Sequence, residues 1–198
     1  MKTVVVLLCV GVVAGLAFAQ QPLDIEKQRT RSVEGTPREF SFAPGTVLSD
    51  TYSGELTSSS PVWNRVYLCN VSTACGAACS DSSQNGEYYD VIPIQVTAVE
   101  NLECAVTASA FADTTMYVYC DPFDPANPLT NVVAWDDDDG TGNWSAFTGA
   151  DGVQLQPGQT YYLVLSTFSP AVTGTFTIDF TSATVHVVPV GLQSFAAE

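Results

Sequence analysis

The sequence predicts an all-β protein, an antiparallel β-sandwich of jelly-roll type folded as a single domain. Three observations lead to this prediction. Apolar and polar residues alternate with a period of two in many short segments, Gly, Pro, Asn, Asp and Ser separate those segments, and no segment keeps a helical period. Such alternation is typical of antiparallel sheets with one apolar face, and two packed sheets bury these faces together.

The chain begins with the features of a secretory signal peptide at residues 1–19. Lys2 precedes an apolar run from Val4 to Val13, and Ala17-Phe18-Ala19 has the pattern of a cleavage site. No later run reaches the roughly 18 apolar residues of a transmembrane helix. The sequence therefore predicts a secreted, extracellular protein without a membrane span. Residues 20–40 are polar, mixed in charge and aperiodic, which predicts a flexible linker or arm.

The predicted strands place apolar residues on one face and polar residues on the other. Ile92, Ile94 and Val96 share a face of the segment at residues 91–98. The pattern recurs in four later segments, which we also expect to be strands: residues 102–109, 116–120, 161–165 and 175–181. A sandwich built from these strands predicts a domain spanning residues 41–182.

Residues 183–198 form a C-terminal extension beyond that domain. The segment from Thr184 to Phe195 has the composition of a strand. We expect an extra strand, which either pairs within its own sheet or adds to the open edge of a neighbouring molecule.

The cysteines predict disulfides. Five remain after residue 19, and in an exported chain they are more often bridged than bound to zinc. A zinc site at Cys69, Cys75 and Cys79 lacks a fourth ligand, because the only histidine is His186. Cys104 and Cys120 lie on the apolar faces of strands that we expect to be neighbours, so we predict that these two form a disulfide. One pairing among Cys69, Cys75 and Cys79 would then close their loop and leave one thiol free or bonded between chains.

The turn Asp136-Asp137-Asp138-Asp139-Gly140 is the most acidic point of the chain. If residues 115–120 and 131–135 pair antiparallel, Asp113 lies at the same end of the sheet as this turn. Converging carboxylates repel one another unless a cation or hydrogen bonds compensate, and Ca²⁺ takes such oxygen ligands. The sequence predicts a Ca²⁺ site formed by Asp113, Asp136, Asp137, Asp138 and Asp139. The alternative is an acidic turn in which aspartates cap backbone N–H groups.

The region from about residue 48 to residue 181 resembles the bacterial pre-peptidase C-terminal domain, a β-sandwich attached to secreted peptidases and other exported proteins. The resemblance lies in the order and spacing of several motifs, which are Tyr88-Tyr89-Asp90, Phe111-Ala112-Asp113-Thr114 leading into Met116–Tyr119, Trp135–Gly140, Ser145, Leu155–Val164 and Gly174–Ile178. The segment Phe123–Leu129 is similar to an insertion in one branch of these domains. The resemblance implies a non-catalytic module that assists secretion, folding or substrate engagement.

Charge excludes several partners. From residue 40 onward there are 17 acidic residues against Arg65 alone. Such a surface repels nucleic acid and anionic membranes and attracts divalent cations. No enzyme is predicted either, because His186 is the sole histidine and four adjacent aspartates on one turn do not separate into an acid and a base.

The predicted function is extracellular binding or adhesion to a protein or glycan by a secreted, non-catalytic module. One alternative is a structural subunit of an extracellular filament or matrix, assembled by strand addition or by an intermolecular disulfide. A second alternative is a carbohydrate-binding module, in which aromatic side chains stack on sugars. The candidates for that stacking are Trp63, Trp135, Trp144, Tyr161 and Tyr162.

Two sequons predict candidate N-glycosylation sites. Asn70-Val71-Ser72 and Asn143-Trp144-Ser145 both match the acceptor pattern, which has consequences only in a host that glycosylates.

Overall fold

The computed structural model describes residues 50–81 and 85–188. The predicted signal peptide at residues 1–19, the arm at residues 20–40, the start of the domain at residues 41–49 and the end of the extension at residues 189–198 lie outside the described residues. The regular elements are β1 Thr51–Leu56, β2 Val62–Trp63, β3 Val66–Tyr67, β4 Ser80–Asp81, β5 Glu87–Val96, β6 Glu100–Asn101, β7 Cys104–Ser109, β8 Thr114–Cys120, β9 Val132–Asp136, β10 Ala146–Phe147, a 3₁₀ helix at Gly149–Asp151, β11 Gln154–Leu155, β12 Thr160–Thr167, β13 Gly174–Phe180 and β14 Val185–Val187. Within the described ranges, no helix has the length and apolar character needed to cross a membrane.

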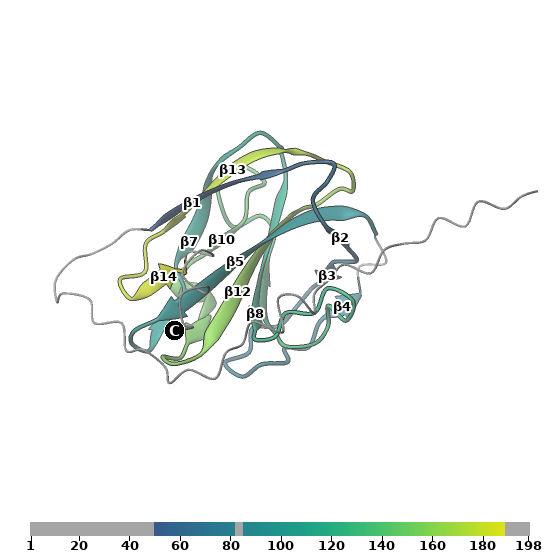
Figure 1. The fold of residues 1–198 in the computed structure, drawn as a ribbon. Coiled ribbons are helices and arrows are strands. Elements are labelled where there is room, and N and C mark those ends of the chain that lie inside the picture. The colour runs from purple at the N-terminus through teal and green to yellow at the C-terminus, as the bar shows by residue number, and fades with distance from the viewer. Residues whose placement is uncertain (1–49, 82–84, 189–198) are drawn as a thin grey trace, which may run out of the picture. The chain divides into compact units, whose positions relative to one another are not determined.

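Two antiparallel sheets form the body of the domain (Figure 1). The first has the strand order β1-β13-β7-β10, and in it the earliest strand pairs with a late one, with Thr51 opposite Asp179. The second has the order β14-β5-β12-β8-β9, with β2 pairing with β5 beside that path. The remaining strands form two short two-stranded sheets, β11-β6 and β3-β4.

The connectivity is that of a jelly roll. Its eight strands are β1, β5, β7, β8, β9, β10, β12 and β13. Numbered one to eight along the chain, they stand in the order 1-8-3-6 in the first sheet and 2-7-4-5 in the second. Consecutive strands thus alternate between the sheets, except for the fourth and fifth, β8 and β9, which are neighbours. Two Greek keys wound together produce this order. The predicted antiparallel β-sandwich of jelly-roll type is confirmed.

The main core lies between the two sheets, where the predicted apolar faces meet. Ile92 and Ile94 of β5 and Met116 and Val118 of β8 have no exposed surface. Leu163 and Leu165 of β12 and Phe176, Ile178 and Phe180 of β13 complete the same cluster. The period-two pattern is therefore satisfied strand by strand, because alternate side chains point into the interior.

A second apolar cluster covers the outer face of the second sheet. Trp63 packs there against Tyr89, Tyr117 and Tyr119, with Val66, Ala77, Val132 and Val164 also buried. All seven residues of β8 are buried as a result. The sequence predicted one buried face for each strand, and for β8 this prediction is wrong. The segment between β1 and β5 folds back over this face and supplies Trp63, Val66 and Ala77 to the cluster.

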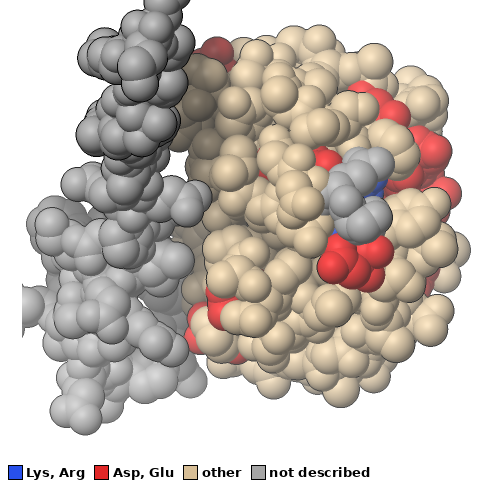
Figure 2. All heavy atoms as spheres, turned by 90° about the vertical axis from the view of Figure 1, so that its right-hand side faces the viewer, with Lys and Arg blue, Asp and Glu red and all other residues tan. Residues whose placement is uncertain are grey.

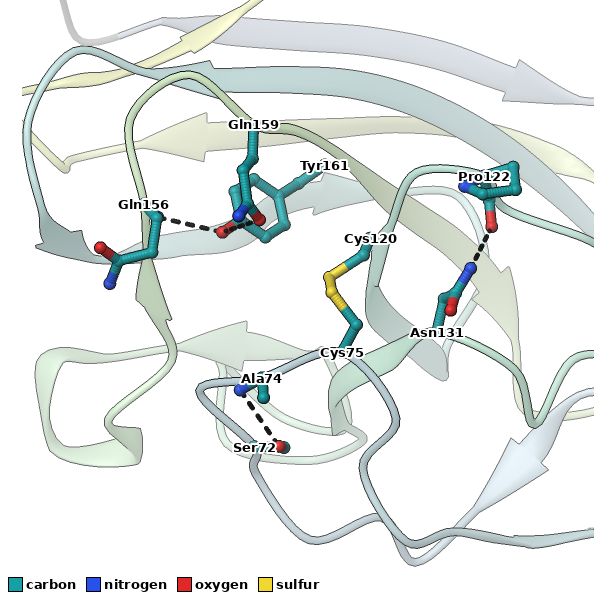
Figure 3. Close-up of a disulfide and its surroundings, with 9 residues drawn as sticks. All are labelled: Ser72, Ala74, Cys75, Cys120, Pro122, Asn131, Gln156, Gln159 and Tyr161. Carbon is teal, nitrogen blue, oxygen red and sulfur yellow. Dashed lines mark hydrogen bonds between the residues drawn. A yellow bond between two sulfur atoms is a disulfide. The ribbon is translucent and has the colours of Figure 1, made fainter.

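The disulfides differ from the predicted Cys104–Cys120 pair. Cys120 is bonded to Cys75 (Figure 3). Cys69 is bonded to Cys79, and Cys104 is a free buried thiol. The prediction failed because β7 and β8 are not neighbours. β7 lies in the first sheet between β13 and β10, whereas β8 lies in the second. The predicted loop bridge among Cys69, Cys75 and Cys79 is confirmed as Cys69–Cys79.

The loop closed by Cys69–Cys79 covers the edge of the second sheet. The backbone N–H of Ser72 donates to the Val133 carbonyl oxygen at 2.8 Å, and those of Gly76 and Ala77 donate to the Val132 carbonyl oxygen at 2.9 and 2.6 Å. Since β9 is the last strand of that sheet, these bonds satisfy carbonyl groups that would otherwise face outward. The Cys75–Cys120 bond holds the loop in this position.

The C-terminal extension contributes a strand to its own sheet. β14 pairs antiparallel with β5, with Val185 opposite Val96 and Val187 opposite Ile94. Two carboxylates anchor it. Glu100 accepts from the backbone N–H groups of Ala183 and Thr184 at 3.0 and 2.7 Å, and Asp50 accepts from the N–H of Val187 at 3.0 Å. Of the two pairings predicted for the extension, the structure shows the one within the chain for these residues.

We expect the Glu100 anchor to weaken in acid. Burial opposes ionisation of this carboxyl, but the hydrogen bonds from Thr184 and Ala183 outweigh it and lower its pKa. Because the pKa is lower in the folded state, its stabilisation is complete above the unfolded pKa of about 4.3 and is lost as pH falls through the folded pKa. Glu100→Gln should lower the free energy of unfolding by about 1 kcal/mol at pH 7, after allowing for solvent screening of a partly exposed group.

Urea unfolding of the wild type and of Glu100→Gln at pH 7 and at pH 3 measures this effect. The difference between the two proteins should be clear at pH 7 and smaller at pH 3. A difference that stays the same at both pH values would contradict the role of the charge.

Candidate divalent-cation site

The site lies at one end of the second sheet, where β8 begins and β9 ends. These strands pair antiparallel with Met116 opposite Asp136, as the sequence predicted. Asp113, just before β8, therefore lies beside the turn that follows β9. A bridge between Asp113 and Asn143 and a 3.1 Å hydrogen bond from the Thr114 N–H to the Asn143 carbonyl oxygen draw the far side of the turn to the same point.

Three of the five predicted ligands come together there. Asp113, Asp137 and Asp138 each offer one carboxylate oxygen, and these three oxygens lie within 4.8 Å of one another. The Oδ1 atoms of Asp113 and Asp137 are buried and have no hydrogen-bond partner. A buried carboxylate oxygen without a donor costs free energy, and a bound cation would remove that cost.

Asp136 and Asp139 do not join this group. Asp136 is the last residue of β9 and stands opposite the core residue Met116, so its side chain faces the core. Its Oδ2 accepts from the N–H of Ala146 at 2.7 Å, and its residue surface is 8% exposed. Burial raises the pKa of Asp136 to about 7, although the hydrogen bond from the Ala146 N–H acts to lower it. The alternative reading, an aspartate that caps backbone N–H groups, applies to this residue, and Asp139 is exposed on the turn.

The turn is fixed from beneath by Ser145 and Gly140. The Ser145 hydroxyl is fully buried and lies 3.0 Å from the Asp137 carbonyl oxygen and 2.8 Å from that of Thr114. The N–H of Gly140 donates to the Trp144 carbonyl oxygen at 2.7 Å. A Cβ at position 140 would lie 2.3 Å from that oxygen, so only glycine permits this close approach. The carboxylates of Asp137 and Asp138 are thus carried by a constrained backbone.

Burial and repulsion both act on these carboxyls. Burial, followed by the charges of Asp138 and Asp113, raises the pKa of Asp137 to about 6, and the charge of Arg65 opposes the shift. For Asp113, burial and then Asp138 raise the pKa, while Asn143 and Arg65 lower it. The carboxylates therefore carry an unfavourable concentration of negative charge, which a cation would relieve.

Arg65 supplies the only Lys or Arg charge among the described residues. It is 1% exposed, its Nη2 donates to the Phe168 carbonyl oxygen at 3.2 Å, and its guanidinium lies 4.6 Å from the centre of the Phe168 ring. Its Nε lies 3.9 Å from Oε1 of the buried Glu87. One positive charge thus acts on Glu87, Asp113 and Asp137 together, which leaves a net negative charge for a divalent ion to offset.

Sequence reasoning missed the pair of Arg65 and Glu87. The available signal was a lone basic residue in an apolar stretch, Val62-Trp63-Asn64-Arg65-Val66, within an otherwise acidic domain. Figure 2 shows one face on which Asp and Glu side chains gather with very little Lys or Arg surface among them.

The aromatic residues proposed for sugar stacking do not form one platform. Trp63 and Tyr161 are 4% and 3% exposed, and they belong to different apolar clusters. Trp144 packs against the main core and its Nε1 donates to the Phe111 carbonyl oxygen at 3.2 Å. Trp135 and Tyr162 are half-buried against the outer cluster. The predicted combination of these five residues in one exposed surface is wrong.

Comparison of the chain with protein-family models, with curated proteins and with solved structures finds no match. The resemblance to the pre-peptidase C-terminal domain therefore stays a prediction.

Proposed function

We propose that this chain is a secreted, non-catalytic β-sandwich module for extracellular binding or adhesion, and that Ca²⁺ bound by Asp113, Asp137 and Asp138 stabilises its fold. The observation that carries the proposal is the convergence of three carboxylates, two of them with buried oxygens that lack a hydrogen-bond donor. Ca²⁺ suits this set because it accepts carboxylates together with loop carbonyls and water in a flexible geometry.

A non-catalytic role is supported by the position of the sole histidine. His186 lies on β14, where its Nδ1 is 3.6 Å from Asp50 Oδ2. β14 and β9 are at opposite edges of the second sheet, so the histidine and the acidic site are separated by β5, β12 and β8. A binding role is supported by the architecture, since loops held at one end of a rigid sandwich are common recognition surfaces.

The filament alternative has less support. Cys104, the one free cysteine among the described residues, is 2% exposed, so in the folded state it is not accessible to a second chain. Burial also raises the pKa of its thiol and keeps it in the unreactive protonated form.

Thermal unfolding with calcium and with chelator tests the proposal. A ligand that binds only the folded state adds RT ln(1 + [L]/Kd), about 2.7 kcal/mol when free Ca²⁺ is a hundredfold above its Kd. We therefore expect the melting temperature to rise by several degrees in millimolar Ca²⁺ relative to EDTA. Mg²⁺ should act less, because it demands octahedral geometry and gives up water reluctantly.

Asp137→Asn should reverse its effect between these two conditions. In EDTA it removes repulsion with Asp113 and Asp138, so the variant should melt at or above the wild type. In Ca²⁺ it lacks a ligand and should melt below the wild type. Glu55→Gln is the matched control, because it removes one exposed charge from β1, and Asp139→Asn tests the aspartate that the structure leaves outside the group.

Equal wild-type melting in Ca²⁺ and EDTA would remove calcium from the proposal. An equal response to Ca²⁺, Mg²⁺ and added salt, shared by Glu55→Gln and Asp137→Asn, would indicate diffuse screening. Binding itself is tested on glycan and extracellular-protein arrays with the mature protein in Ca²⁺ and in EDTA. Failure to bind any probe in either condition would count against the recognition role.

A further inference from the structure

The loop from Leu68 to Cys79 presents Asn70 in a fixed position. It leaves β3, is closed by Cys69–Cys79, and is tied to the end of β8 by Cys75–Cys120. Asn70 is exposed, and its backbone N–H donates to the Ala78 carbonyl oxygen at 3.0 Å. No hydrogen bond of the Asn70 side chain is found among the described residues. The exposed Asn70 amide therefore extends from a backbone that the two disulfides hold in place.

Exposed apolar side chains lie on both sides of Asn70. Leu68 is 58% exposed and Val71 is 41% exposed. Five large apolar residues among those that the structure describes are at least 41% exposed, and these are two of them. Leu68 also has a φ of 49°, in the left-handed region that a leucine rarely adopts. Leu68 and Val71 thus present apolar side chains to solvent close in sequence to the acceptor residue.

We propose that Asn70 carries an N-linked glycan, and that this glycan covers Leu68 and Val71. Asn70-Val71-Ser72 is an acceptor sequon, and a glycan on its first residue lies directly over the neighbouring side chains. The inference rests on the proposed secretion of the chain and does not depend on calcium.

The chemistry is an amide glycosylation. The Asn70 Nδ2 forms a bond to C1 of the first sugar of a polyisoprenyl-diphosphate oligosaccharide. The C1–O bond to the diphosphate breaks, the diphosphate lipid leaves with the bonding pair, and the amide loses one proton. The remaining amide N–H and the carbonyl stay available, and the residue has no buried role that the modification would disturb.

The second sequon lacks these properties. Asn143 bridges to Asp113 and lowers the pKa of that carboxyl, and the Asn143 carbonyl oxygen accepts from the N–H of Thr114. The hydroxyl-bearing residue of that sequon, Ser145, is fully buried beneath the acidic turn. A glycan on Asn143 would lie beside the carboxylates of the candidate site. A glycan on Asn70 would lie on the loop that covers the edge of the second sheet.

Peptide mapping of the secreted protein tests the modification. The full chain is expressed with its own residues 1–19 in a eukaryotic secretory host, and the medium is treated with peptide-N-glycosidase in ¹⁸O-water. The Asn70 peptide should carry the ¹⁸O-labelled aspartate, and Asn70→Gln and Ser72→Ala should each abolish the glycan that Asn143→Gln leaves in place. A secreted, signal-cleaved protein with unmodified Asn70 overturns the inference. Retention of the chain inside the cell would instead contradict the proposed secretion.

Dye binding tests the covering role. Asn70→Gln should increase the fluorescence of an apolar-surface dye, and Asn70→Gln with Leu68→Ser and Val71→Ser should return it to the wild-type value. No increase in Asn70→Gln would overturn the covering role. Light scattering tests whether a second copy of the chain covers these side chains instead of the glycan. If the wild type is a dimer and the double variant Leu68→Ser/Val71→Ser is a monomer, the covering role of the glycan is overturned.

Discussion

Replacing Cys75 and Cys120 by serine is expected to lower the free energy of unfolding by about 4 kcal/mol. The bond joins residues 45 apart in sequence, and a cross-link of that span removes a corresponding amount of chain entropy from the unfolded state. The same estimate for Cys69–Cys79, with a separation of 10, gives about 3 kcal/mol. Loss of the longer bridge should also free the loop that covers β9, which adds to its cost.

Urea unfolding followed by circular dichroism measures both effects. The double variants Cys75→Ser/Cys120→Ser and Cys69→Ser/Cys79→Ser form a matched pair, because each removes one bond and leaves Cys104 unchanged. Amide hydrogen exchange at Ser72, Gly76 and Ala77 reports on the loop and should accelerate more in the first variant. Equal stability losses and equal exchange would contradict the structural role assigned to Cys75–Cys120.

Trp63→Ala is expected to cost about 3–5 kcal/mol, the range for a large aromatic residue removed from a core. Trp63 is 4% exposed, and its ring lies 4.9 Å from that of Tyr117 and 5.4 Å from that of Tyr89, measured between centroids. Its Nε1 donates to Ser166 Oγ at 3.1 Å. The alanine variant therefore leaves a cavity in the outer cluster and removes a buried donor.

Two controls separate these causes. Trp63→Phe keeps an aromatic ring but loses the bond to Ser166, so it should cost about 1–2 kcal/mol, within the usual range for one hydrogen bond plus imperfect packing. Trp144→Ala removes a tryptophan that is only half-buried against the main core and should cost less than Trp63→Ala. If Trp63→Ala is no more harmful than Trp144→Ala, the outer cluster is not a second core.

The sandwich could be predicted because its evidence is local. Ile92 and Ile94, or Met116 and Val118, alternate with other residues in the sequence itself, and this pattern assigns a buried face without knowledge of any partner strand. The outer layer could not be predicted in this way. Tyr117 and Tyr119 occupy the opposite face of β8, and only the segment carrying Trp63 and Val66, far away in sequence, decides that they are buried.

The cysteine pairing failed for the same reason. Whether Cys104 meets Cys120 depends on which strands are neighbours, and in a jelly roll consecutive strands mostly lie in different sheets. Local alternation places a cysteine on a face but does not identify its neighbour. For the loop, the sequence predicted one bridge among Cys69, Cys75 and Cys79 without choosing between the pairings, and the structure shows Cys69–Cys79.

The candidate site was predictable in part. Antiparallel pairing of β8 and β9 placed Asp113 beside the acidic turn, and the structure confirms this pairing. The assignment of Asp136 failed because β9 continues one residue further than expected, which turns that side chain to the core. Arg65 was missed because its approach to Glu87 and to the acidic turn arises from the fold-back of the segment that carries it.

The order of the strands has a consequence for the time at which the domain can fold. Thr51 pairs with Asp179, so the first sheet needs residues separated by 128 positions, and β13 also lies between β1 and β7. A chain that emerges from the ribosome or from an export channel with its N-terminus first cannot complete that sheet until β13 has appeared. Topologies dominated by such distant pairings fold slowly, because closing a long loop loses chain entropy before the contacts that compensate for this loss have formed. Under the secretion that we propose, the first sheet would close only after β13 had crossed the membrane.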